Sequence, residues 1–155
     1  MKIAIVQIRG TIRTHRKIKD TLNILKLRKK NSCIITDNSL IIVGMLNIIK
    51  DYVTWGEVNE DVIKELLVKR GKVVGDKPLT EEYLKRNAKI SFDEFTKKFV
   101  ENKIKLREIP GLKPYFRLKP PKKGFERYGI KMPYSMGGAL GYRKENINDL
   151  VKRMI

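Results

Sequence analysis

The sequence predicts an α+β fold, in which a small three-stranded sheet carries two helices on one face and is followed by a helical and extended C-terminal region. Three observations predict it. Short β-branched runs alternate with helical apolar spacing up to residue 58, helix patterns alone fill residues 59–108, and proline, glycine and aromatic residues gather after residue 109. A chain of 155 residues suits one domain, or one domain with an extension. We therefore expect a β-α-β-α-β core (1–58), a helical extension (59–108), and a basic extended loop with a terminal helix (109–155).

The first predicted strand is the apolar run Ile3–Ile8, which ends before Gly10. A helix is predicted from Lys17, because Ile18, Leu22 and Leu25 fall on one helical face. We expect this helix to continue to Lys30, so that the cations of its last turn complement the helix dipole.

Three further elements complete the core. The run Cys33–Ile35 predicts a second strand, Ile41–Ile49 a short and largely buried helix, and Tyr52–Trp55 a third strand. The resulting order is β-α-β-α-β, which favours one small sheet with both helices packed on the same face.

The middle segment has the pattern of ordinary helical packing. Asn59 and Gly71 predict the two ends of one helix, a second is expected at 81–86, and Ser91 with Glu94 forms a capping-box pattern for a third. We expect these helices to cover the sheet or to link its two charged flanks.

Residues 110–144 differ sharply from the rest. They hold five of the six prolines, six of the eleven glycines and six of the twelve aromatic residues, and Glu126 is their only acid. Such a segment is costly to order without a partner. Helical spacing over Ile147–Met154 predicts a terminal helix that ties the loop back to the body.

The net charge of +18 indicates an anionic partner. Residues 1–56 carry 11 basic and 3 acidic groups, and residues 109–155 carry the same numbers, whereas residues 57–108 carry 13 and 11. Cations interleaved with aromatic rings suit phosphate contacts and stacking on unpaired bases, as in proteins that bind folded RNA. We therefore predict nucleic-acid binding, while an aromatic residue such as Tyr115 or Phe116 is about as well explained as an anchor on its own domain.

The sequence lacks the residue sets of several chemistries. The single histidine, His15, cannot assemble a histidine metal cluster or a serine triad within one chain, and Cys33 lies in an apolar strand pattern that favours a buried thiol. The glycines at 71–75 and 137–141 fit neither a phosphate loop nor a dinucleotide-binding loop. We therefore expect that the protein is not an enzyme and that it binds no cofactor, metal ion or small-molecule substrate. One cysteine, no long apolar run and a strand pattern at the start favour a cytoplasmic protein without a membrane span or secretory signal.

Two sets of stretches carry a family resemblance: 8–11, 18–22, 44–46 and 50–56 in the first segment, and 137–143, 147–150 and 153–154 in the last. The first set resembles the L30 family of large-subunit ribosomal proteins, and the second resembles the C-terminal signature of its longer archaeal and eukaryotic form. The resemblance runs in order through nearly the whole chain. It implies a fold related to ferredoxin-like folds and a structural role on the ribosome.

The resemblance also implies that the basic segments face ribosomal RNA, with 5S rRNA as a further candidate and other large-subunit proteins as neighbours. The RNA-binding residues expected on this basis are Arg9, Arg13, His15, Arg16, Lys17, Lys29, Lys30, Lys113, Arg117, Lys119, Lys122, Lys123, Arg127, Lys131, Tyr134 and Arg143.

Two other functions fit parts of the sequence. A free-standing nucleoid or chromatin protein would use the same charge on duplex DNA. An RNA-processing enzyme would require His15 and acidic residues to converge in space.

Overall fold

The computed structural model describes residues 1–88 and 90–155, and these residues form a mixed five-stranded sheet in the order β4-β2-β1-β3-β5. The central three strands pair antiparallel, with Ile5 opposite both Ile34 and Trp55. The short strand β4 adds antiparallel to β2, and β5 adds parallel to β3. The strands are β1 (Lys2–Gln7), β2 (Ser32–Asp37), β3 (Val53–Glu57), β4 (Phe116–Arg117) and β5 (Gly141–Tyr142).

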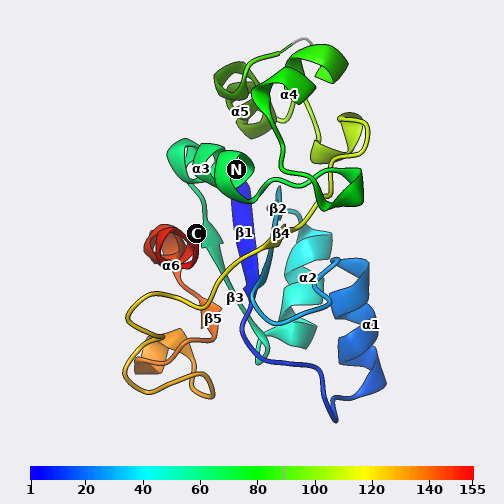
Figure 1. Ribbon diagram of the computed structural model, residues 1–155. Helices are drawn as coiled ribbons and strands as arrows, with labels where there is room; N and C mark the ends of the chain where they lie inside the picture. Colours follow the sequence, from blue (N-terminus) through cyan, green and yellow to red (C-terminus); the bar gives the residue numbers. More distant parts are fainter. Residues whose placement is uncertain (89) are drawn as a thin grey trace.

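Helices α1 (Arg16–Ile24) and α2 (Leu40–Ile49) pack together on one face of the sheet, as the sequence predicts (Figure 1). Successive strand residues point to opposite faces, so Ile3 and Ile5 of β1 share a core with Leu22, Leu46 and Ile49 of the two helices. The prediction of an α+β sheet with both early helices on one face is therefore confirmed.

The later helices cover the opposite face. Ala4 and Val6 of β1 pack there with residues of four helices, and Figure 1 shows α3 and α6 across the sheet from α1 and α2, with α4 and α5 at one end. These helices are α3 (Glu60–Arg70), α4 (Glu81–Ala88), α5 (Phe92–Val100) and α6 (Ile147–Met154). Short 3-10 turns lie at η1 (Val74–Asp76), η2 (Leu106–Glu108), η3 (Tyr134–Met136) and η4 (Lys144–Asn146).

Helix α1 is shorter than predicted. It ends at Ile24 because Lys26 adopts a left-handed conformation (φ 61°), which lets the Leu27 amide donate to the Leu22 carbonyl at 2.8 Å. The Lys26 amide also donates to the Asn23 carbonyl at 3.0 Å, which completes a Schellman motif. Lys29 and Lys30 therefore lie in the turn before β2 and not in the last turn of a helix.

Helix α2 is less buried than predicted. Leu46 and Ile49 are buried, but Leu40 and Ile41 are 90% and 71% exposed. The sequence pattern is apolar all around the helix, so the exposed side could not be identified from periodicity.

The three predicted segments contribute to one sheet and one core. The terminal segment supplies β4 and β5 to the sheet of the first segment. One core joins Cys33 of the first segment, Phe95 of the second and Phe116 of the third.

Candidate nucleic-acid interface

The predicted basic segments meet around the end of β1. The Asn31 amide donates to the Gln7 carbonyl at 2.8 Å, and the Leu118 amide donates to the Asn31 carbonyl at 3.0 Å. Asn31 can serve both neighbours because it turns the chain in a left-handed conformation (φ 64°). Backbone hydrogen bonds thus join the end of β1, the residue after the Lys29–Lys30 turn and the residue before Lys119, so the basic segments that adjoin these three points lie close together.

The loop between β1 and α1 exposes most of its cations. Arg9 is held at its base, with its guanidinium 5.0 Å from the centre of the Tyr52 ring and a hydrogen bond to the Asp51 carbonyl at 3.2 Å. His15 caps α1, because its Nδ1 accepts from the Lys17 amide at 3.3 Å. The exposed cationic side chains of this region are Arg13, Arg16, Lys17, Lys19, Arg28, Lys29 and Lys30.

Residues 119–143, which we term the strap, are built around a buried arginine. Arg143 is 2% exposed, and its guanidinium makes a bidentate ion pair with the carboxylate of Glu126. It also donates to the Thr54 Oγ1 at 2.8 Å and to the Ala139 carbonyl at 2.9 Å. Its guanidinium therefore joins the C-terminal end of the strap to Glu126 in its first half, and it fixes both to Thr54 of β3.

The carboxyl group of Glu126 is ionised in this setting. Burial by itself raises its pKa, but the hydrogen bonds from Arg143 and the charges of Arg143 and Arg153 outweigh burial and leave the pKa below its ordinary value of 4.5. The Arg153 guanidinium lies 3.5 Å from the same carboxylate, so α6 is part of this arrangement.

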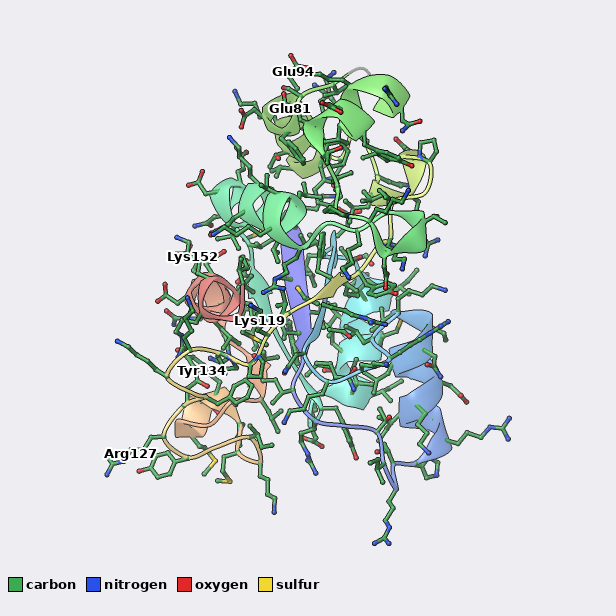
Figure 2. The ribbon with its side chains drawn as sticks, in the orientation of Figure 1. Glu81, Glu94, Lys119, Arg127, Tyr134 and Lys152 are labelled. Carbon is green, nitrogen blue, oxygen red and sulfur yellow. The ribbon has the colours of Figure 1, made fainter. Side chains whose placement is uncertain are left out.

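Backbone contacts fix the rest of the strap and leave its cations outside. The Lys119 and Lys122 amides donate to the Met154 and Arg153 carbonyls of α6 at 2.9 and 3.0 Å. Ala139 and Leu140 pack on Ile8, next to the basic loop. Figure 2 shows Lys119 of the strap beside the sheet, and Tyr134 and Arg127 at the end of the molecule opposite α4 and α5. The exposed cations of the strap are Lys119, Lys122, Lys123, Arg127 and Lys131.

The aromatic residues of this region divide into two groups. Phe116 is fully buried in the main core, and Tyr115 and Phe125 pack against core clusters. Tyr128 is 62% exposed, and Tyr134 lies over the Arg143 guanidinium at 4.6 Å from the ring centre. The aromatic interleaving seen in the sequence thus serves the fold as well as the surface.

Three expected RNA-binding residues are not among the exposed cations of the loop and the strap. Arg143 is buried, and every nitrogen of its guanidinium is hydrogen-bonded within the protein, so its position does not support direct contact with RNA. Lys113 forms an ion pair with Asp76, whose pKa is lowered by the hydrogen bond and charge of Lys113. Arg117 lines a small cleft together with Gly71.

That cleft contains cations that the sequence did not single out. It measures about 190 Å³, and its basic lining comes from Lys69, Arg70, Lys72 and Arg117. The first three belong to the middle segment. The net charge of that segment is small, because acidic residues on α3, α4 and α5 nearly balance its basic residues. Only their gathering at the C-terminal end of α3 identifies them.

The described residues contain no group of three or more histidine, cysteine or acidic side chains placed to hold a metal ion. Among them, no helix has the length and apolar character to span a membrane. His15 caps α1 on an exposed loop, and Cys33 is fully buried in β2.

Comparison with known proteins identifies the family. The family described as "Ribosomal protein L30p/L7e" matches residues 3–53. The chain is 49% identical to "Large ribosomal subunit protein uL30" of Methanopyrus kandleri over 96% of this chain and all of that protein. It is 46% identical to the protein of the same name from Nanoarchaeum equitans (98% of this chain, 97% of that protein) and 40% identical to that from Pyrobaculum islandicum (99% and 94%). The family resemblance predicted from the sequence is therefore confirmed, and the chain belongs to the uL30 family of ribosomal proteins.

Proposed function

We propose that this chain is a structural constituent of the large ribosomal subunit and binds ribosomal RNA. The observation that carries the proposal is the nearly full-length similarity to proteins named "Large ribosomal subunit protein uL30". The geometry supports it, because the chain holds exposed cations on a loop and a strap that are fixed to the same end of the sheet.

The proposed contact region, termed the basic surface, combines two kinds of group. Lysine and arginine side chains neutralise phosphates and release counterions, which gives affinity with little dependence on sequence. An exposed ring such as Tyr128 can stack on an unpaired base. The basic surface comprises Arg9, Arg13, His15, Arg16, Lys17, Lys29, Lys30, Lys119, Lys122, Lys123, Arg127, Tyr128, Lys131 and Tyr134.

Arg143 has a positioning role in this proposal. Its ion pair with Glu126 fixes the strap before RNA arrives, so binding does not have to order the whole segment. Arg117 lines a second cationic area with Lys69, Arg70 and Lys72. The acid of this area, Asp76, is paired with Lys113, so the other cations are suited to a phosphate of the same RNA.

The three segments have different roles in this proposal. The core (1–58) supplies the first basic loop, and the terminal segment (109–155) supplies the strap. The extension (59–108), which places Glu81 and Glu94 at the opposite end of the molecule, covers the sheet (Figure 2). As a ribosomal constituent the chain would work in the cytoplasm beside other large-subunit proteins without catalysing a reaction, and 5S rRNA is a further candidate partner.

Sucrose-gradient fractionation of cell extracts tests the assignment. The chain should sediment with the large subunit, and it should remain there after a moderate salt wash. Recovery in the free pool alone would contradict the proposal.

A competition experiment separates ribosomal RNA from duplex DNA. At matched salt, structured ribosomal RNA should displace a duplex of equal phosphate content from the purified chain, because the proposed surface combines phosphate contacts with stacking on unpaired bases. Equal competition by the duplex would favour a DNA-coating protein instead.

A further inference from the structure

An apolar cleft lies apart from the basic surface. It measures about 350 Å³ and opens where the end of α1 and the start of α2 approach η2. Its apolar lining includes Leu25, Ile34, Met45, Phe99 and Leu106. These side chains come from both cores of the protein, so the cleft marks the boundary between the α1–α2 layer and the helical extension.

An exposed aliphatic stripe runs from this cleft along α2. Ile41, Met45 and Ile48 are spaced by four and three residues, so they follow one line along the helix. Ile41 is 71% exposed and Ile48 is 37% exposed, while Met45 lines the cleft. Ile24 of α1, which is 61% exposed, also lines the cleft. We term the cleft together with this stripe the α2 groove.

The charge around the groove is positive. Lys26, Lys105 and Arg107 line the cleft, and its one acidic lining residue, Asp37, is paired with Lys2 at 2.6 Å. This rim favours a partner with carboxylates beside its apolar side chains. It also disfavours a second copy of this chain, because the same cations would then face one another.

RNA fits the groove less well than a protein does. Isoleucine side chains offer neither a plane for base stacking nor a hydrogen-bonding group, and phosphates do not remove aliphatic carbon from water. Contiguous exposed apolar residues with a polar rim are typical of protein interaction sites. We propose that the α2 groove binds an amphipathic segment of another protein in the large subunit, with apolar anchors and acidic flanks; this rests on the proposed function.

Site-specific photocrosslinking in assembled large subunits tests the proposal. Benzoylphenylalanine placed at residue 41 should crosslink to protein, and the crosslinked peptide should contain aliphatic residues flanked by Asp or Glu. The same probe at residue 131, on the strap, should crosslink to RNA. Digestion with ribonuclease or protease distinguishes the two adducts.

Matched variants on α2 show whether the groove itself is responsible. With the probe at residue 41, Ile48→Asp should lower the yield of the protein adduct about tenfold, because a buried isoleucine contributes roughly 1.5–3 kcal/mol. Val43→Asp is the control: Val43 has similar exposure (41%) on the opposite flank of the same helix, and its variant should retain the yield.

The possible outcomes separate the two proposals. An RNA adduct at residue 41, a protein adduct on a basic segment, or no adduct while residue 131 still crosslinks to RNA would overturn the groove proposal alone. Absence of the chain from the large subunit would overturn the proposed function and the groove proposal together.

Discussion

At the scale of single residues, Arg143 stands in the most basic stretch of the chain but keeps its charge inside the protein. It is 2% exposed and bonded to Glu126, Thr54 and Ala139. Removing one member of a buried ion pair is costly, because the other charge is left without a partner in a poorly solvated place. The stability of the strap should therefore depend on Glu126, the only acid between residues 110 and 144.

We expect Glu126→Gln to lower the free energy of unfolding by about 3 kcal/mol at pH 7, since it leaves the Arg143 charge unpaired. The folded-state pKa of Glu126 lies below 4.5, so its contribution to stability is complete above pH 4.5 and is lost as the pH falls through the folded-state value. Urea unfolding at several pH values checks both points. The exposed Glu145→Gln is the control, and a gap between Glu126→Gln and the parent that stays constant into acid would contradict the account.

Cys33 should be inert while the protein is folded. Burial raises the pKa of its thiol to about 12, so at pH 8 only about one molecule in ten thousand carries the reactive thiolate. We expect iodoacetamide to modify the chain quickly in guanidinium chloride and slower by orders of magnitude in native buffer, as followed by mass spectrometry. A native rate equal to that of a small free thiol would show that β2 opens readily.

At the scale of elements, the sequence predicts what local patterns determine. The apolar run of β1 and the Ile18–Leu22–Leu25 spacing of α1 lead directly to a strand and a helix. The two-residue strands β4 and β5 could not be predicted, because only their tertiary partners, β2 and β3, define them. The exposed side of α2 was missed for a related reason, since which side faces the sheet depends on packing and not on an apolar pattern.

The same holds for the candidate site. Charge counts pointed to the strap and to the loop after β1, whose cations are exposed. They could not show that Arg143 is buried, because its partner Glu126 lies 17 residues away in sequence. Charge counts also missed the cleft lined by Lys69, Arg70 and Lys72, because only the fold brings Arg117 beside these three residues.

The joint between β3 and the end of the strap depends on Gly56. A Cβ atom there would overlap the Lys144 carbonyl oxygen and press on the Ile147 side chain, at the point where α6 begins. We expect Gly56→Ala to destabilise the fold by about 1–3 kcal/mol, the usual cost of overpacking, and to make the strap more sensitive to protease. Thermal unfolding and limited proteolysis measure these effects.

Gly44 supplies the contrast for that experiment. It lies within α2 with open space where a Cβ would stand, so Gly44→Ala should stabilise the protein by about 1 kcal/mol through helix propensity. If Gly44→Ala and Gly56→Ala shifted stability in the same direction, close packing at Gly56 would not be the cause.

At the scale of the whole molecule, excess positive charge is concentrated at the end formed by the strap, whereas the middle segment, with 13 basic and 11 acidic groups, is nearly balanced. Figure 2 shows Glu81 and Glu94 at the end formed by α4 and α5, whereas Arg127 and Tyr134 lie at the end formed by the strap. Salt screens charges beyond about 10 Å at 0.1 M, so a cation affects RNA binding strongly only where it approaches a phosphate. Position should therefore matter more than net charge.

Two triple variants with equal loss of charge test this statement. Changing Lys119, Lys122 and Lys123 to Ala should weaken binding to ribosomal RNA and make the slope of log K against log salt shallower by roughly one unit per lost phosphate contact. Changing Lys85, Lys97 and Lys98, which are exposed on α4 and α5, should leave the slope close to that of the parent. Fluorescence anisotropy across a salt series measures both. Equal changes of affinity and slope in the two variants would mean that net charge alone determines RNA binding. The basic surface would then not be the contact region.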